Sequence, residues 1–585
     1  MPRQTYKPVD PQIASLVEEY ASSSEAVLEV LTDLQEQRGQ LTPSAIADVA
    51  RALQIPVEKA YGIASFYSML QISDQEPAKK HVVRVCDGPV CWLCQGLSTK
   101  QAIETALAGR KDWQVERTSC LGLCDRAPSA LVDETQVGPL HPEDAGKLAD
   151  GFSGQAPDYS QPSPGELRVM LAQAGKVDPD SLESALAHGA YQAMQKALER
   201  SSESVLHEVE ESGLTGRGGA GFPVGRKWRF VAQAARTPKY IICNADESEP
   251  LIFKDRVLID TNPHQLLEGM AIAGYATGTQ AGYIYIRGEY ASQAKRLELA
   301  IAQAERAGWL GNHIQGTDFS FHIHVHRGAG AYICGEETAL IESLEGKRGE
   351  PRNRPPYPPT AGYHGLPTLV NNVESYNAVP AILLNGAPWY RSLSTYPTPG
   401  TKLYMLLGHV NQPGLFEAPF GLTLRQVIEQ FGGGMLPGSA FNLALTGGAA
   451  GTIVSSTLLD TPVDYASASK GISLGAGAFL VCDQRVSPVS LLRELLHFFT
   501  VESCGKCTPC RLGTYRSLEI LDKLVAGQGG PGDINELLTL AEVMQSASFC
   551  GLGQSVAVPV KSAINNFRPA FEAAQSANEL IRKNP

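Results

Sequence analysis

The chain of 585 residues is too long for one hydrophobic core, and its length predicts about four domains. Its 43% hydrophobic and 19% charged residues are typical of a soluble protein, and its formal net charge of −12 disfavours a nucleic-acid partner, because counterion release requires a basic surface. The sequence has no apolar stretch of signal-peptide type and no run approaching the ~18 apolar residues of a membrane span. We therefore expect a cytoplasmic protein that does not span a membrane directly.

The first segment with a clear pattern is helical. Apolar residues between 27 and 34 recur at helical spacing and end at Gly39. Thr42 and Pro43 then have the residue types of an N-cap and a first helical turn, and apolar residues continue to Leu53. These patterns predict a small helical module that ends near Tyr67.

A first set of cysteines follows this module in two pairs. Cys86 and Cys91 have the spacing C-x4-C, and Cys120 and Cys124 have the spacing C-x3-C. Two pairs of thiolates suit two irons bridged by sulfides, so the pattern favours a [2Fe–2S] cluster. Cys94 forms a C-x2-C pair with Cys91, which leaves a redox or zinc function of that pair as an alternative.

The cysteine pairs lie in a predicted α/β unit. Residues 82–85 and 130–132 are expected to form strands, so that residues 81–150 make a compact unit with the cysteines on its loops. Residues 151–164 are rich in Gly, Ser, Pro and Gln, which is typical of a linker. Residues 165–205 are expected to be helical and rather polar.

A glycine-rich loop occupies residues 216–222, with the sequence Gly-Arg-Gly-Gly-Ala-Gly-Phe. It formally matches G-x-G-x-x-G, but the preceding residues 205–212 are expected to be helical, so the ordinary dinucleotide fingerprint is not supported. A plain glycine-rich turn is one interpretation. Alternatively, the loop's N–H groups can cradle a phosphate, with Lys227 as the matching cation.

Polar clusters follow several predicted strands. Residues 239–243 form an apolar strand that ends in the polar segment 244–249, and residues 321–326 form a strand with three alternating histidines. Residues 335–338 then open a helix, and residues 371–374 supply amide groups. Because open α/β sheets bind ligands at the carboxyl ends of their strands, these clusters predict a ligand site. The histidines are expected to have a partner each, with a metal site as the weaker alternative.

A second cysteine set lies near the C-terminus. Cys504, Cys507 and Cys510 have the spacing C-x2-C-x2-C, and Cys550 can complete a set of four thiolates. This arrangement favours a [4Fe–4S] cluster. Zinc is a weaker alternative because its sites prefer two C-x2-C pairs, and disulfides are weaker still without a secretory signal.

Residues 212–223, 244–247, 335–338 and 503–511 together resemble the flavin-bearing NADH-oxidising subunit of respiratory complex I and its relatives. The N-terminal 150 residues resemble the separate small partner of that subunit, a thioredoxin-like [2Fe–2S] protein. Both are fused here, and no further ferredoxin-like cysteine set follows Cys550. The chain therefore most resembles the diaphorase subunits of soluble NAD-reducing [NiFe] hydrogenases, which implies an iron–sulfur electron-transfer subunit and hydrogenase subunits as partners in a hetero-oligomer.

The resemblance implies a multidomain α/β protein with six parts. These are an N-terminal helical bundle (1–78), a thioredoxin-like [2Fe–2S] domain (79–150), a linker and helical connector (151–205), a Rossmann-like FMN- and NAD-binding domain (206–399), a β-grasp (SLBB-like) domain (400–484) and a C-terminal helical bundle with the [4Fe–4S] cluster (485–585).

The resemblance also implies roles for individual residues. The FMN-binding residues would be Gly216, Arg217, Gly218, Gly219, Lys227, Asn244, Asp246, Glu247, Gly335, Glu336, Asn371 and Asn372. The residues at NAD(H) would be Phe222, Phe230, Glu249, Glu337, Arg354 and Tyr357. The chain departs from the family pattern at Ser248 and Leu251, where glycines are common, and at Arg354 and Tyr357, where a lysine and a phenylalanine are usual.

This set of roles predicts the chemistry. NADH gives up two electrons as a hydride whereas an iron–sulfur cluster accepts one, so a flavin is needed between them, and no side-chain acid or base has to drive the hydride transfer. The carboxylates of Glu249 and Glu337 predict a preference for NAD(H) over NADP(H), although Arg354 can offset their charge. The alternatives are the same module of an NAD-dependent formate dehydrogenase or of a complex I-type enzyme and, in a different class, a non-enzymatic iron–sulfur scaffold or zinc-binding assembly protein.

Overall fold

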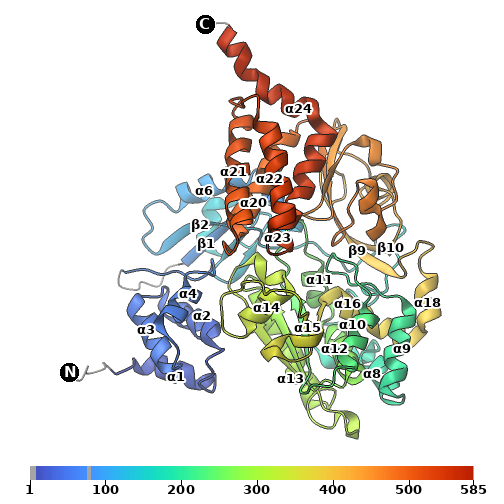
Figure 1. The fold of residues 1–585 in the computed structure, drawn as a ribbon. Helices are drawn as coiled ribbons and strands as arrows, with labels where there is room; N and C mark the ends of the chain where they lie inside the picture. The colour runs from blue at the N-terminus through green and yellow to red at the C-terminus, as the bar shows by residue number, and fades with distance from the viewer. Residues whose placement is uncertain (1–7, 75–80, 584–585) are drawn as a thin grey trace.

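The computed structural model describes residues 8–74 and 81–583. Figure 1 shows an N-terminal helical module at the lower left, three separate β-sheets with their helices, and a C-terminal helical bundle at the top. The largest hydrophobic core extends from the N-terminal helices through the central sheet to the C-terminal bundle, and two further parts keep cores of their own. The predicted multidomain α/β architecture is confirmed.

The N-terminal module is helical, as its sequence pattern predicts. The hydroxyl of Thr42 accepts a hydrogen bond from the N–H of Ala45 and caps its helix, and Gly39 ends the preceding helix with a φ of 88°. Tyr67 is buried against the central domain at the end of this module. The four helices are α1 (Pro11–Glu19), α2 (Val27–Arg38), α3 (Pro43–Ala52) and α4 (Val57–Ala64).

The next unit is a four-stranded sheet with the strand order β2-β1-β3-β4, in which β1 and β2 are parallel and the other pairs antiparallel. Its strands are β1 (His81–Cys86), β2 (Trp113–Thr118), β3 (Ala130–Val132) and β4 (Thr135–Val137). Its helices are α5 (Pro89–Leu93) and α6 (Gly96–Ala106). The two predicted strands are therefore present, and the cysteines lie at or just beyond the strand ends.

The connector is less helical than its sequence predicts. Only α7 (Leu182–Ala187), α8 (Gln192–Leu198) and the start of α9 (Ser202–Ser212) fall in the segment 165–205. Residues 169–171 instead donate their N–H groups to the buried carboxylate of Glu417 at 2.9–3.1 Å. A side chain from another domain thus satisfies donors that a helix would otherwise satisfy.

The central domain contains a parallel sheet with the strand order β7-β6-β5-β8. From β5 the chain adds β6 and β7 on one side and β8 on the other, so the topology switches between β5 and β8, where open α/β sheets bind ligands. The strands are β5 (Tyr240–Ala245), β6 (Ala281–Ile286), β7 (His322–Arg327) and β8 (Thr368–Asn372). The main helices are α10 (Val224–Ala232), α11 (Lys254–Thr261), α12 (Pro263–Thr277), α13 (Ala291–Arg306), α14 (Glu337–Leu344), α15 (Pro358–Ala361), α16 (Val373–Asn377), α17 (Val379–Asn385) and α18 (Ala387–Ser392).

The third sheet has the strand order β10-β9-β13-β11-β12 and follows the central domain in the chain. Its strands are β9 (Thr401–Gly408), β10 (Gly414–Pro419), β11 (Phe441–Thr446), β12 (Thr452–Val454) and β13 (Ala478–Asp483). The C-terminal bundle contains α20 (Pro488–Glu502), α21 (Thr508–Val525), α22 (Asp533–Ala547), α23 (Gly551–Ser555) and α24 (Ala557–Lys583). None of the helices in the described ranges is long and apolar enough to cross a membrane.

Candidate functional site: a polar cavity beside two sets of cysteines

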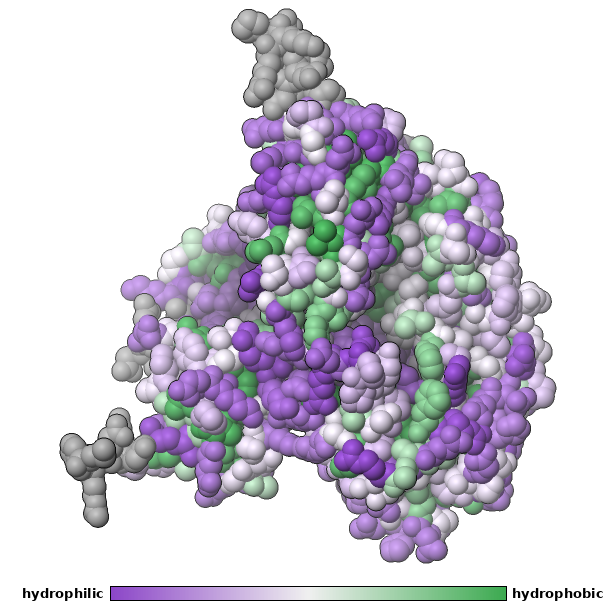
Figure 2. All heavy atoms as spheres, in the orientation of Figure 1, coloured by the Kyte–Doolittle hydropathy of each residue, from purple (hydrophilic) through white to green (hydrophobic). Residues whose placement is uncertain are grey.

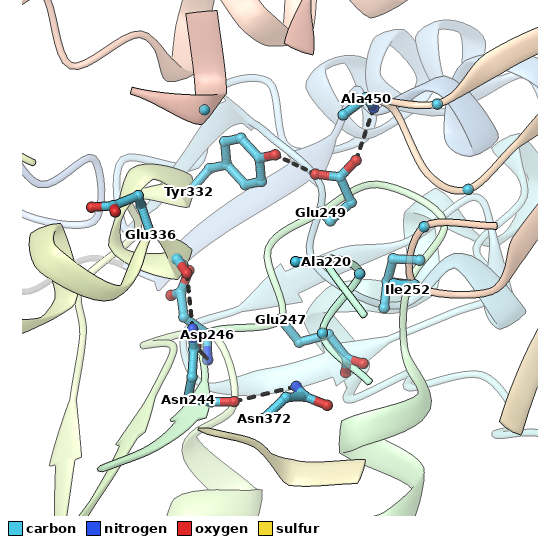
Figure 3. A pocket seen from close by; sticks show the side chains of 18 of the residues that line it. Ala220, Asn244, Asp246, Glu247, Glu249, Ile252, Tyr332, Glu336, Asn372 and Ala450 are labelled. Atoms are coloured by element: carbon cyan, nitrogen blue, oxygen red, sulfur yellow. Dashed lines mark hydrogen bonds between the residues drawn. The ribbon is translucent and has the colours of Figure 1, made fainter. Parts of the chain in front are cut away.

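A cavity of about 530 Å³ lies at the carboxyl ends of β5 and β8, at the switch in topology. Figure 3 shows acidic and amide side chains from the central domain on one side and the backbone near Ala450 of the third sheet on the other. Half of the predicted cofactor-binding residues line it, namely Gly218, Gly219, Asn244, Asp246, Glu247, Glu249, Gly335, Glu336 and Asn372. The sequence-distant segments that were expected to bind one ligand therefore meet at one cavity.

The glycine-rich loop presents free main-chain donors to this cavity. The N–H of Gly216 donates to Phe222 O at 2.8 Å, but the described residues offer no acceptor to the N–H groups of Gly218, Gly219 and Ala220. Gly219 has a φ of 121°, and a Cβ on Gly218 would lie 3.3 Å from the Cβ of Asn372. Three unpaired donors on a loop without side-chain bulk are suited to a phosphate.

Two basic residues of the predicted flavin site point elsewhere. The Arg217 guanidinium is fully buried, donates to Thr215 Oγ1 at 2.7 Å and to Tyr390 OH at 2.9 Å, and lies 4.5 Å from the ring centre of Phe420. Lys227 Nζ donates to the main-chain oxygen of Val370 at 3.0 Å. Neither side chain lines the cavity.

The asparagines hold the cavity wall together. Asn244 Nδ2 donates to Gly335 O at 2.8 Å, which ties the end of β5 to the loop after β7. Asn372 accepts from Lys254 Nζ at 2.9 Å and donates to Asp255 Oδ2 at 2.6 Å. Asn371 lies outside the cavity, because its side chain accepts from Trp228 Nε1 at 2.8 Å in the amide orientation that suits its neighbours.

Two buried acceptors on the cavity wall lack donors. Asp246 Oδ2 and Glu336 Oε1 have no hydrogen-bond partner in the described part of the chain, although Arg354 Nη1 lies 3.5 Å from the second atom. Burial raises the pKa of Asp246, and it raises the pKa of Glu247 to about 8. Unsatisfied buried acceptors are costly, so these atoms fit a ligand that brings N–H or O–H donors, as a flavin does.

Glu249 is the one predicted NAD(H) residue on the cavity wall. Its Oε1 accepts from the N–H of Ala450 at 2.9 Å, and its Oε2 accepts from the hydroxyl of Tyr332 (Figure 3). Burial raises the pKa of this carboxyl. Glu249 therefore joins the central domain to the third sheet at the cavity.

The other predicted NAD(H) residues do not line the cavity. The carboxylate of Glu337 lies between two cations, 3.3 Å from Lys227 Nζ and 3.8 Å from Arg354 Nη1. The same Lys227 Nζ lies 6.0 Å from the ring centre of Phe222. Three aromatic side chains in this part of the sequence stay exposed, namely Phe222 (42%), Phe230 (45%) and Tyr357 (55%). Exposed aromatic rings next to a cavity are suited to stacking on a planar ligand.

The N-terminal cysteine set is gathered and buried. Cys86, Cys91, Cys120 and Cys124 are all buried, and the sulfurs of Cys120 and Cys124 are 3.5 Å apart. The neighbouring thiols of Cys120 and Cys91 raise the pKa of Cys86. The N–H of Gly122 points to Cys120 Sγ at 3.5 Å. Cys94 is only half-buried, and burial raises the pKa of its thiol to about 11, which favours the protonated form. Four thiols with a main-chain donor fit a [2Fe–2S] cluster.

The C-terminal cysteine set also converges. Cys504, Cys507, Cys510 and Cys550 line one small cavity, and the N–H of Phe549 points to Cys507 Sγ at 3.5 Å. In the described ranges no three His, Cys, Asp or Glu side chains are arranged around a single metal ion. An iron–sulfur cluster differs in this respect, because it places several atoms between its thiolates.

The three sites adjoin one another. Ile333 and Leu552 line both the central cavity and the cavity of the C-terminal cysteines. On the other side, Arg287 donates to Cys120 O and to Glu247 O, each at 2.6 Å. Single residues thus separate the polar cavity from each set of thiols.

Sequence reasoning missed several residues of the cavity. Lys254, Asp255, Tyr332 and Tyr465 line it, as do the glycine-containing loops 447–451 and 473–476 of the third sheet. The paired glycines Gly447 and Gly448, which directly follow β11, were a usable signal. Lys254 gave none, because a lysine in a helical segment is usually exposed.

The three alternating histidines of β7 have protein partners. His322 Nε2 lies 3.2 Å from Asn312 Oδ1, His326 Nδ1 lies 2.6 Å from Glu29 Oε1, and His324 packs on Tyr283 with the ring centres 5.5 Å apart. The expectation of a partner for each histidine is confirmed.

The parallel sheet with a polar cavity at its topology switch, flanked by two sets of four thiols, defines an electron-transfer protein of the flavin and iron–sulfur class. Four family models match the chain in agreement with this class. They are the Nuo51 FMN-binding domain (209–381), the NADH-ubiquinone oxidoreductase-F iron–sulfur binding region (490–574), the thioredoxin-like [2Fe–2S] ferredoxin (13–153) and the SLBB domain (403–453).

Relatives give the same result. The chain is 44% identical over 407 residues to the F 2 subunit of NADH-quinone oxidoreductase from Rhizobium meliloti, a match that spans 69% of this chain and 97% of that protein. It is 43% identical over 410 residues to the NADP-reducing hydrogenase subunit HndC of Solidesulfovibrio fructosivorans, spanning 70% and 83%. A solved structure of NAD⁺-reducing [NiFe]-hydrogenase in the H₂-reduced state matches with a TM-score of 0.82 and 33% identity over 95% of this chain and 93% of the other.

The chain belongs to the family of NADH-oxidising flavin and iron–sulfur proteins that includes the F 2 subunit of NADH-quinone oxidoreductase. It is an NAD(H)-dependent oxidoreductase whose cofactors are FMN, a [2Fe–2S] cluster and a [4Fe–4S] cluster.

Proposed function

We propose that this chain is the diaphorase module of a soluble NAD-reducing [NiFe] hydrogenase. The observation that carries the proposal is the extent of the match. The NAD⁺-reducing hydrogenase chain matches 95% of this chain, whereas the oxidoreductase relative from Rhizobium meliloti matches 69%. The thioredoxin-like part and the flavin part are thus fused in the same way as in the hydrogenase chain. A complex I-type enzyme or an NAD-dependent formate dehydrogenase is the alternative.

In this proposal the cavity holds FMN, with its phosphate on the N–H groups of residues 218–220. The buried acceptors Asp246 Oδ2 and Glu336 Oε1 would be available to hydrogen-bond donors elsewhere on the flavin. When bound, FMN supplies the conversion between a hydride and single electrons. The asparagine contacts and the buried charges keep the wall rigid, which preserves the orientation that hydride transfer requires.

The dinucleotide binds over the exposed aromatic residues beside the cavity. Phe222, Phe230 and Tyr357 provide ring surfaces for stacking, and Glu337 is held between Lys227 and Arg354. A nicotinamide ring that enters past these aromatic residues would reach the cavity near Glu336. The bound ring would then exclude water from the reacting atoms.

The cysteines provide the route for electrons. We assign the [2Fe–2S] cluster to Cys86, Cys91, Cys120 and Cys124, and the [4Fe–4S] cluster to Cys504, Cys507, Cys510 and Cys550. The shared walls at Ile333 and Leu552 favour the [4Fe–4S] cluster as the first acceptor from the flavin.

A partner protein has a suitable surface next to this cluster. Figure 2 shows apolar side chains exposed over the C-terminal helices. Those with at least 47% of their surface exposed on α20, α21 and α22 are Val501, Leu512, Tyr515, Val525 and Val543. Exposed apolar side chains on this bundle are suited to a protein contact, as expected for a module that passes electrons to an iron–sulfur subunit and hydrogenase subunits.

The test is purification of the native complex, followed by nickel analysis and assays of NAD⁺ reduction with H₂ and with formate. We expect a nickel-containing subunit and reduction that depends on H₂. A complex without nickel that reduces NAD⁺ with formate would show that the chain belongs to a formate dehydrogenase instead. The proposed diaphorase chemistry would be unchanged.

A further inference from the structure

A group of buried charges joins the flavin cavity to the third sheet. Lys402 on β9 is completely buried, and its Nζ donates to Glu374 Oε2 at 2.8 Å and to Arg217 O at 3.4 Å. Glu374 Oε2 also lies 3.2 Å from Lys254 Nζ, and its other oxygen accepts the N–H of Leu403 at 3.0 Å. One buried carboxylate thus holds two lysines from different domains.

Both lysines bind residues that contact or adjoin the glycine-rich loop. Lys402 contacts the main-chain oxygen of Arg217, the residue directly before Gly218. Lys254 lies on the cavity wall and binds Asn372, whose Cβ is 3.3 Å from the place that a Gly218 Cβ would take. Each ammonium group therefore binds a residue next to Gly218, Lys402 through Arg217 and Lys254 through Asn372.

These buried charges do not balance. The cations are Lys254, Lys402 and Arg217, and the carboxylates in contact with them are Asp255 and Glu374. Glu247 also interacts with Lys254, but burial raises the pKa of its carboxyl to about 8, which favours the neutral form at pH 7. Arg217 is fully buried, and its guanidinium hydrogen-bonds only to a hydroxyl of threonine, a hydroxyl of tyrosine and a main-chain oxygen in the described residues. At pH 7 this group of buried side chains therefore carries one positive charge in excess, and a buried charge requires a counter-ion.

We propose that Lys402 of the third sheet is a positioning residue of the flavin site. Its positive charge favours ligands that place an anionic group on the glycine-rich loop. This inference rests on the proposed placement of the FMN phosphate. It makes the third sheet part of the cofactor site, although its lysine does not reach the cavity. The phosphate of FMN carries nearly two negative charges above pH 7, and at short range in a buried site its attraction to the ammonium is strong.

The test compares FMN with riboflavin, which has the same ring and no phosphate. Dissociation constants are measured by flavin fluorescence on the full chain after flavin removal, for the wild type, Lys402→Met and the control Lys239→Met. Lys239 donates to Ala232 O and Thr277 O and does not line the cavity. We expect Lys402→Met to lower the ratio of FMN to riboflavin affinity roughly tenfold, about 1.4 kcal/mol, and Lys239→Met to leave the ratio unchanged.

The outcomes are distinct. A wild type that does not prefer FMN would overturn the placement of the phosphate and this inference with it. A wild type that prefers FMN, with the ratio retained in Lys402→Met, would overturn the inference alone. Equal weakening of both flavins would also overturn it, because it would show that Lys402 only supports the fold.

A pH series provides a measurement in which Lys402 itself is not replaced. Burial lowers the pKa of Lys402 to about 8, and Glu374 opposes this fall while Lys254 and Arg217 add to it. A bound phosphate favours the charged lysine, so the FMN-to-riboflavin ratio should fall as the pH rises from 7 through 8 to 9. Glu247 faces the same cavity and titrates in this range, so the series is made in Glu247→Gln. A flat ratio in that background would overturn the inference.

Discussion

The ion pair between Asp125 and Arg256 should fix the [2Fe–2S] unit on the flavin domain. Arg256 Nη2 lies 2.7 Å from each carboxylate oxygen of Asp125, and the two side chains, Arg256 and Asp125, are 3% and 1% exposed. Asp125 directly follows Cys124, and Arg256 Nε also donates to Gly122 O at 3.3 Å. The perturbation that we consider is Asp125→Asn, which keeps the size of the side chain and removes its charge.

The expected size of the effect follows from burial. Removing one partner of a buried ion pair usually costs ~3–5 kcal/mol, because the other charge is left without compensation. Arg256 retains Asp260, whose carboxylate lies 3.6 Å from Nη1. We therefore expect a cost at the lower end of this range, about 3 kcal/mol. This cost corresponds to a roughly hundredfold decrease in the ratio of molecules with a docked [2Fe–2S] unit to molecules without one.

The assay is denaturant unfolding of the full chain, followed separately by [2Fe–2S] absorption and by flavin fluorescence. Asp125→Asn should shift the iron–sulfur transition to lower denaturant more than the flavin transition. A double-mutant cycle with Arg256→Met isolates the pair, and Asp112→Asn, from the exposed pair with Arg110 at 3.2 Å, is the control without a measurable effect. A coupling energy below about 0.5 kcal/mol would refute the reasoning.

Three further predictions concern the cofactors. Gly218→Val should abolish FMN retention, because the new side chain meets Asn372. The control Gly146→Ala should retain FMN, because a Cβ there meets no atom within 4 Å. Stoichiometric FMN in Gly218→Val would contradict the placement of the phosphate on the loop. The kcat/KM for NADH should exceed that for NADPH by at least ~tenfold, about 1.4 kcal/mol. This ratio should grow with pH as the buried carboxyl of Glu249 ionises, and Glu249→Gln should reduce it, whereas equal wild-type values would contradict the prediction. Iron and sulfide should approach about six each per chain, four plus two. Both contents should fall in Cys91→Ser but not in Cys94→Ser. The reverse result would show that Cys94, and not Cys91, binds the [2Fe–2S] cluster.

The sequence pattern alone was sufficient for the elements whose signals are local. The N-cap at Thr42, the end of the helix at Gly39 and the strands around the first cysteine pair are where the residue types predict them. The helical expectation for residues 165–181 was wrong, because the distant Glu417 binds the main chain there. The helical or strand preference of a segment decides its structure only where no distant side chain binds the main-chain N–H and C=O groups of that segment.

The cofactor classes were also accessible from the sequence, because the spacing of cysteines and the resemblance of short motifs are properties of the chain itself. The roles of single side chains were not. Arg217 stands in the glycine-rich loop, yet its guanidinium is buried away from the cavity, and Asn371 faces Trp228 while its neighbour Asn372 faces the cavity. The direction of a side chain depends on its partners across the fold.

The tertiary structure alone decided which distant charges meet. Lys254, Glu374 and Lys402 are separated by 28 to 148 positions in the chain, and each has the residue type of an exposed surface. They come together because β9 of the third sheet packs behind the glycine-rich loop, where each charge is stable only beside the others. The sequence by itself therefore determined the cofactors and the order of the domains' motifs, and the packing of those domains decided the electrostatics of the site.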